Sequence, residues 1–112
     1  MDEEFGSFET ELKRGFIQTI VLIALDERMY GYGMLKFFER IGYAVDESTL
    51  YPLLRRLEKN GWIASEWDVG EDRPKKFYRI TDRGRAIRDR ALGAWRVQAE
   101  ILGKIMEVRR EA

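Results

Sequence analysis

The chain of 112 residues contains no cysteine and no histidine. Without cysteine it can form no disulfide and no thiolate metal site, and it has no thiol nucleophile. Without histidine it lacks the usual general base and the commonest metal ligand. Its acidic residues fall mostly at the spacing of a helix surface, and no cluster of them lies in a loop. These absences argue against an enzyme and predict no metal ion or other cofactor.

Long apolar runs are also missing. No stretch of about 18 apolar residues is present, so the sequence predicts no membrane span. The acidic start, Met1 to Glu4, has no signal-peptide pattern, which predicts a cytoplasmic protein. The length predicts one domain, whose core is small enough to gain stability from a partner.

The formal net charge is zero, which argues weakly against nucleic-acid binding, but the charges are unevenly placed. Residues 2–11 hold five acidic side chains and no basic one, whereas residues 73–90 hold eight basic and two acidic side chains. Screening limits the reach of each charge to roughly 8–10 Å in physiological salt, so a local basic patch can attract phosphate whatever the net charge is. A solvated helix face beside a strand would give the same pattern.

The apolar pattern predicts two helices in the first part of the chain. A helix at about 8–26 is apolar on more than one face and is expected to be buried in the centre of the fold. Residues 29–33 are expected to form a turn that enters a second helix at about 31–41, which Gly42 ends.

A third helix is predicted between Asp46, a good N-cap, and the stop at Asn60-Gly61. Pro52 lacks a backbone donor, so either this helix begins late or its second turn tolerates a missing hydrogen bond. Leucines at helical spacing give the third helix one apolar face: Leu50, Leu53, Leu54 and Leu57.

A β-hairpin is predicted to follow. Strands at 62–69 and 76–80 flank a polar loop at 70–75, and Thr81 or Asp82 caps a last helix that runs to about residue 110. Three helices followed by a hairpin with a basic tip are typical of a winged helix, in which the third helix and the tip can engage one DNA duplex together.

The last helix carries an apolar seam whose residues are spaced by 3, 4, 3 and 4, as at a contact between two helices. We expect a second copy of the chain to cover this seam. Alternatively, the last helix folds back on the first helix of its own chain, or both contacts occur together. The predicted seam consists of Leu92, Trp95, Ala99, Leu102 and Met106.

Three blocks of sequence together resemble the PadR family of transcriptional regulators. They are Y-G-Y-G at 30–33, S-T-L-Y-P-L-L-R-R-L-E-K-N-G at 48–61 and R-P-K-K-F-Y-R-I-T-D-R-G at 73–84. The resemblance covers about residues 14–110. It implies a mainly α fold with a small β-hairpin, in which residues 1–81 form a winged helix-turn-helix and residues 82–112 a dimerisation helix, as in the smaller PadR subfamily. It also implies a homodimeric DNA-binding regulator, expected to be a repressor of a near-palindromic operator.

The predicted DNA-binding residues lie on the third helix and at the hairpin tip. Hydroxyls at the start of the helix suit phosphate or base-edge contacts, and Arg55 can contact guanine at two points or bind phosphate. Glu71 and Asp72 stand where the family usually has two glycines, and they dilute the charge of the tip. The candidate DNA-binding set is Ser48, Thr49, Tyr51, Pro52, Arg55, Arg56, Arg73, Lys75 and Lys76.

The resemblance also suggests an effector site. In some small PadR members a tryptophan of the last helix lines a cavity at the dimer centre and holds a flat aromatic compound. Trp95 matches it in position, although packing between subunits without a ligand also explains this residue and is the simpler interpretation. The competing function for the whole chain is a winged helix that contacts proteins and not DNA, which the neutral net charge favours.

Overall fold

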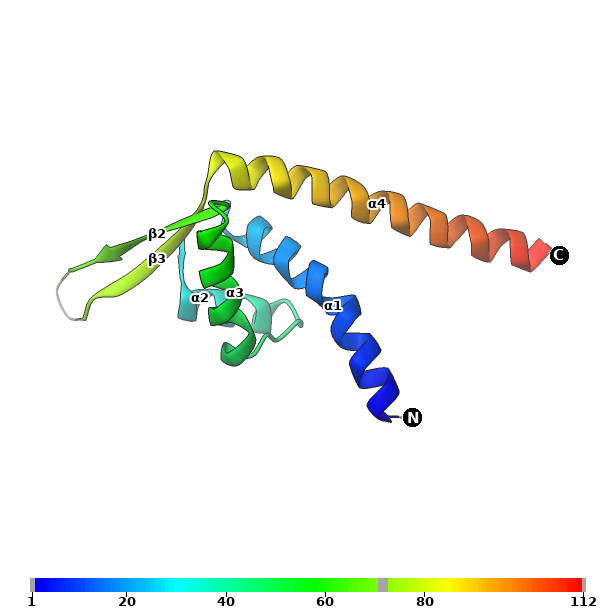
Figure 1. The fold of residues 1–112 in the computed structure, drawn as a ribbon, viewed down its shortest axis with the longest axis horizontal. Helices are drawn as coiled ribbons and strands as arrows, with labels where there is room; N and C mark the ends of the chain where they lie inside the picture. Colours follow the sequence, from blue (N-terminus) through cyan, green and yellow to red (C-terminus); the bar gives the residue numbers. More distant parts are fainter. Residues whose placement is uncertain (1, 71–72, 112) are drawn as a thin grey trace.

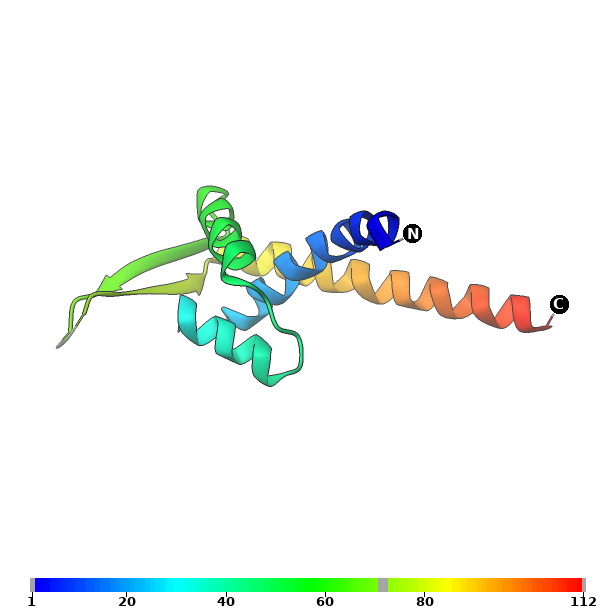
Figure 2. The same cartoon turned by 90° about the horizontal axis from the view of Figure 1, so that it is seen from below.

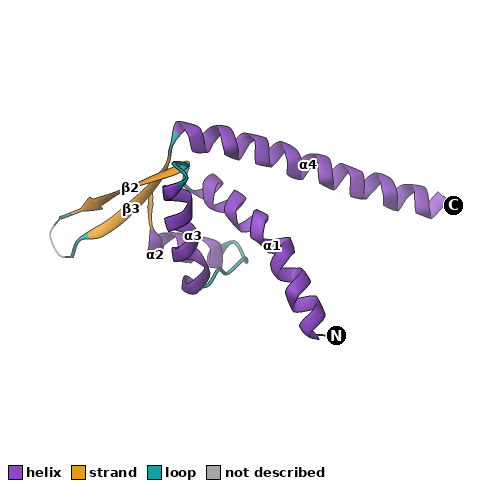
Figure 3. Cartoon of the chain, in the orientation of Figure 1, coloured by secondary structure: helices purple, strands orange, loops and turns teal. Residues whose placement is uncertain are grey.

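The computed structural model describes residues 2–70 and 73–111. The elements follow in the order α1 (Asp2–Ala24), β1 (Met29–Tyr30), α2 (Gly31–Arg40), α3 (Glu47–Lys59), β2 (Ile63–Asp68), β3 (Lys75–Ile80) and α4 (Asp82–Glu111). The predicted mainly α fold with a small hairpin is confirmed. Figures 1 and 3 show the helix-turn-helix of α2 and α3 beside the hairpin of β2 and β3, with α4 leaving the domain as a long arm.

One apolar core holds α1, α2, α3 and the sheet together. The four leucines of α3 are all buried, as their spacing predicts. They pack with the second half of α1, with α2 and with the inner face of the hairpin. The other large side chains of this core are Val21, Leu22, Leu25, Met34, Phe38, Ile63, Tyr78 and Ile80.

Helix α3 includes Pro52 in its interior, so the helix tolerates one missing backbone hydrogen bond and does not begin late. Asp46 is the N-cap residue, but its carboxylate makes no capping hydrogen bond, contrary to the expectation from the sequence. The backbone carbonyl of Asp46 instead accepts from the N–H groups of Thr49 and Leu50, at 3.0 and 2.9 Å.

The sheet has a third strand that the sequence did not predict. The strand order is β1-β3-β2, and both pairings are antiparallel. Residues Met29 and Tyr30, expected to form only a turn, pair with Tyr78 and Phe77 of β3. A strand of two residues shows no periodicity in the sequence, and only the position of β3 beside it makes it a strand.

The N-terminal half of α1 and most of α4 extend away from the domain (Figures 1 and 2). Helix α1 begins at residue 2, well before the predicted start near residue 8, because apolar residues at helical spacing continue toward the N-terminus. Phe5, Phe8 and Leu12 on this extension are more than half exposed. No helix among residues 2–70 and 73–111 has the length and apolar character needed to cross a membrane.

Candidate nucleic-acid interface

The outward side of α3 is a narrow ridge of polar and basic residues. With 100° between successive residues, Ser48, Pro52, Arg55 and Lys59 lie opposite the buried leucines. All four are exposed. Lys59 belongs to this ridge although it was not among the predicted DNA-binding residues, and its spacing of four from Arg55 is the signal that places it there.

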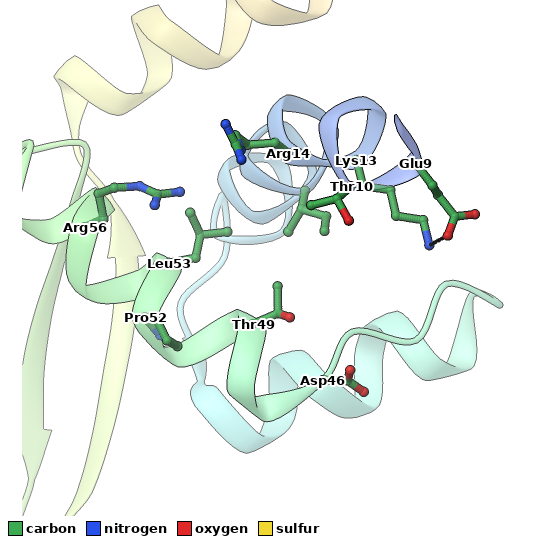
Figure 4. Close-up of a pocket in the computed structure, with 10 residues that line it drawn as sticks. Glu9, Thr10, Lys13, Arg14, Asp46, Thr49, Pro52, Leu53 and Arg56 are labelled. Carbon is green, nitrogen blue, oxygen red and sulfur yellow. Dashed lines mark ion pairs between the residues drawn. The ribbon is translucent and has the colours of Figure 1, made fainter. Parts of the chain in front are cut away.

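The remaining predicted residues of α3 lie on the two flanks of this ridge. Tyr51 faces the start of α2 and the hairpin, where it shares a cleft with Tyr30, Lys75 and Lys76. Thr49 and Arg56 lie on the other flank and line a groove against α1 (Figure 4). The sequence grouped these residues as one surface, whereas the structure separates them into a ridge and two flanks.

Tyr51 packs against the backbone of Gly31 at the start of α2. A Cβ atom on Gly31 would lie 2.7 Å from Cε1 and 2.8 Å from the hydroxyl oxygen of Tyr51. Only a glycine therefore leaves room for the phenol in this position. Burial and, next, the carboxylate of Glu47 raise the pKa of the Tyr51 hydroxyl, so that the group keeps its proton and can still donate a hydrogen bond.

We expect Gly31→Ala to displace the Tyr51 ring and to weaken binding to specific DNA while the fold is kept. The side chain of Tyr51 can rotate away, so the cost should resemble that of moderate overpacking, about 1–3 kcal/mol. Urea unfolding measures the stability and a mobility-shift titration measures the affinity. Gly33→Ala is the control, because nothing lies within 4 Å of its Cβ position. Equal effects of the two substitutions would contradict the close packing of Tyr51 against Gly31.

The basic residues of the hairpin differ in the contacts that they make with other residues of the chain. Lys76 Nζ lies 3.8 Å from the Glu58 carboxylate of α3, which ties the hairpin to the helix and offsets part of the charge. Lys75 Nζ lies over the Tyr30 ring, 5.1 Å from its centroid. Arg73 is exposed. Glu71 and Asp72, the predicted acidic residues of the tip, lie outside the described residues.

In the second half of the basic run at 73–90, Arg85 and Arg88 form ion pairs within the chain. Arg88 donates to Asp26 at 2.8 Å and to Asp89 at 3.1 Å, and Arg85 donates to Asp82 at 2.7 Å. The pair with Asp26 joins the start of α4 to the turn that follows α1, and the other two lie within α4. The alternative of a solvated helix surface therefore applies to this part of the run, and of the basic run at 73–90 it is the hairpin residues Arg73, Lys75 and Lys76 that lie near α3.

Trp95 contacts the first helix of its own chain. Its indole Nε1 donates to Thr19 Oγ1 at 3.0 Å, and its ring meets Phe16 edge to face, with centroids 5.5 Å apart. The residue is half-buried in a groove between α1 and α4. The alternative in which α4 folds back on α1 thus holds at Trp95, while Ala99, Leu102 and Met106 farther along the seam are exposed.

Residues 2–70 and 73–111 hold no cluster of acidic side chains suited to a metal ion. The arrangement on α3 and the hairpin is instead one of exposed donors and cations around a convex helix, which suits contact with a polyanion.

Comparisons with known proteins agree with this arrangement. The family model for transcriptional regulators of the PadR-like family matches residues 20–90. The transcriptional regulator Rv3488 of Mycobacterium tuberculosis is 38% identical over 77 residues, which are 68% of this chain and 72% of that protein.

Solved structures of regulators share the fold. A PadR family regulator from Eggerthella lenta has a TM-score of 0.83 at 40% identity and covers 95% of each chain. A transcriptional regulator from Clostridium thermocellum has a TM-score of 0.75 at 33% identity and covers 84% of this chain and 96% of its own. The fold, the family model and these relatives together show that the chain belongs to the PadR-like family, whose members are transcriptional regulators and not enzymes.

Proposed function

We propose that the protein is a homodimeric regulator that represses transcription by occupying a near-palindromic DNA operator. The observation that carries this proposal is the exposed ridge of Ser48, Pro52, Arg55 and Lys59 on α3, with the basic hairpin beside it. An α-helix of this kind fits the major groove of B-form DNA, which is about 12 Å wide. In the dimer, two such helices enter successive major grooves about 34–36 Å apart.

Within the ridge, Arg55 is the proposed reader of bases. It lies in the middle of α3 on the outward side, and its guanidinium can donate two hydrogen bonds to the O6 and N7 atoms of guanine. Ser48 and Thr49 near the start of the helix suit phosphate oxygens, which the helix dipole also favours. Arg73, Lys75 and Lys76 of the hairpin add phosphate contacts that raise affinity without reading sequence.

The proposed dimer uses the exposed apolar residues of both long helices. The exposed fractions of Ile101, Leu102, Ile105 and Met106 of α4 lie between 48% and 66%. Phe5, Phe8 and Leu12 of α1 are exposed to a similar degree. An apolar surface of this extent on a small regulator marks a protein contact. Residues 82–112 thus serve as the dimerisation helix, and residues 1–81 carry the winged helix.

An effector is a further part of this proposal. A small planar aromatic compound would bind at the groove of Trp95, whose ring remains half-buried while its N–H is engaged by Thr19. Such a ligand can release the operator only if it prefers one dimer geometry over the other. As a regulator of transcription, the protein is expected to act in the cytoplasm.

The test is a mobility shift with the DNA upstream of the protein's own gene, measured at several salt concentrations. We expect the logarithm of the association constant to fall linearly with the logarithm of the salt concentration. Absence of any shift at low salt for folded protein would favour the competing function, a winged helix that contacts proteins.

Arg55→Ala should weaken binding to the specific DNA by about 1–3 kcal/mol for each half-site and binding to random DNA much less, because a base contact is lost in each half of the dimer. The same titration with random duplex separates the two effects. Arg110→Ala, near the end of α4, is the matched control for the loss of one arginine. An equal loss on both DNAs would make Arg55 a phosphate contact.

A further inference from the structure

Helix α3 has a second neighbour besides the hairpin. On the flank opposite the hairpin, α1 runs beside it and encloses a groove of about 440 Å³ (Figure 4). The groove is lined from α1 by Thr10, Lys13, Arg14 and Ile17, and from the α3 side by Asp46, Thr49, Pro52 and Arg56, with Glu9 at one end.

The groove side of α1 is distinct from its apolar side. Phe5, Phe8, Leu12 and Phe16 follow one another at helical spacing and form one stripe of the helix. Thr10, Arg14 and Ile17 lie more than a quarter turn away from this stripe at 100° per residue. A partner that covers the apolar stripe therefore leaves the groove side of α1 open.

The groove contains more positive than negative charge at its mouth. Figure 4 shows the guanidinium groups of Arg14 and Arg56 extending to the same opening, one from each wall. Neither forms an ion pair with another described residue, whereas Lys13 is paired with Glu9 at 3.6 Å. Thr10 donates to the Gly6 carbonyl at 2.9 Å, and its hydroxyl oxygen remains an acceptor. Asp46 and Glu9 are the opposing carboxylates.

We propose that Arg14 of α1, together with Arg56, binds the DNA phosphates on the side of α3 opposite the hairpin. A helix with its side chains is about 10–12 Å across, so a helix in the major groove has a phosphate strand along each flank. Lys75 and Lys76 of the hairpin contact the phosphates of one strand. Arg14 and Arg56 of the α1–α3 groove contact the phosphates of the other strand, so that α1 contacts DNA as well as the second subunit.

This inference rests on the proposed function, since it requires that α3 enters duplex DNA. It differs from that function in assigning a DNA contact to α1, where the sequence pattern showed only an acidic and apolar helix. Phosphate contacts add affinity and salt dependence and carry little sequence preference. Their loss should therefore lower the salt dependence and should weaken binding to specific and random DNA alike.

The experiment compares the wild-type protein with Arg14→Ala, Arg56→Ala and the double variant. Binding to the specific duplex and to a random duplex is titrated at four salt concentrations. Each single substitution removes one phosphate contact from each half of the dimer and should reduce the magnitude of the slope of log K against log salt by about 1.8, and the double variant by about twice that amount. The affinity should fall by the same factor on both duplexes, because phosphate is common to both.

Arg110→Ala serves as the control for a general loss of charge, and circular dichroism with urea unfolding checks that each variant is folded. If the wild-type protein binds DNA but Arg14→Ala leaves its slope and affinity unchanged, the contact by α1 is refuted. A loss confined to the specific duplex would also overturn it, because Arg14 would then read bases. If the wild-type protein itself does not bind DNA, the proposed function is refuted. This outcome differs from the one in which the wild-type protein binds and the substitution of Arg14 has no effect.

Discussion

Gly84→Ala is expected to destabilise the protein severely, although glycine to alanine normally favours a helix. Gly84 lies buried in the first turn of α4. A Cβ atom there would lie 2.0 Å from the carbonyl oxygen of Trp62, 2.9 Å from its carbonyl carbon and 2.8 Å from Cγ1 of Ile80. The nearest atom, the Trp62 carbonyl oxygen, belongs to the backbone, which cannot rotate away as a side chain can. We expect a loss of about 3 kcal/mol or more, at the upper end of overpacking in a core.

The close approach at Gly84 is built by Thr81, which joins the sheet to α4. The Thr81 N–H donates to the Trp62 carbonyl at 3.1 Å, and its hydroxyl donates to the Gly61 carbonyl at 2.7 Å. The same hydroxyl oxygen accepts from the Gly84 N–H at 3.0 Å. An added methyl group must push α4 away from this network, so both packing and hydrogen bonds are lost.

Urea unfolding at fixed protein concentration measures this effect, because the stability of the proposed dimer would depend on concentration. Gly93→Ala is the matched control in the same helix, since nothing lies within 4 Å of its Cβ position. It should stabilise the helix by up to about 1 kcal/mol. A Gly84→Ala protein as stable as Gly93→Ala would contradict the close packing of α4 on the Trp62 carbonyl.

The double substitution Leu102→Glu with Met106→Glu is expected to convert the proposed dimer to a monomer and to abolish most binding to the proposed operator. Both side chains are 66% exposed within one chain, so the substitutions should leave the fold of the single chain intact. At an apolar contact between subunits, however, they would bury unpaired carboxylates, which costs several kcal/mol. Loss of the linked second half-site then lowers the apparent affinity by roughly 10²–10⁴.

Sedimentation measures the solution mass, and the mobility shift measures binding to full and half operators. Lys104→Glu changes the net charge by the same two units and lies in the charged strip of α4 with Glu100 and Glu107, so it controls for added negative charge. It should remain dimeric. A double variant that stays dimeric at micromolar concentration would refute the contact through Leu102 and Met106.

The amino-acid sequence alone predicted the winged helix because each of its parts has a local signature. The leucines of α3 repeat with the period of a helix, Asn60-Gly61 ends it, and the hairpin strands are found within one residue of their predicted limits. The three motif blocks then indicated the family, which the family model and the relatives confirmed. The predicted roles of individual residues in DNA binding remain predictions.

Other features depend on atoms that are far apart in the chain, so no local pattern could reveal them. Strand β1 exists because β3 lies beside it, and Trp95 is held by Thr19, which is 76 residues away. The ion pairs of Arg85 and Arg88 with Asp26 offset part of the charge of the basic run. Local spacing fixes which face a residue takes on its helix, whereas only tertiary packing decides what that face meets. The sequence therefore determined the fold and the family, and the tertiary structure decided that α3 presents one ridge flanked by the hairpin on one side and by α1 on the other.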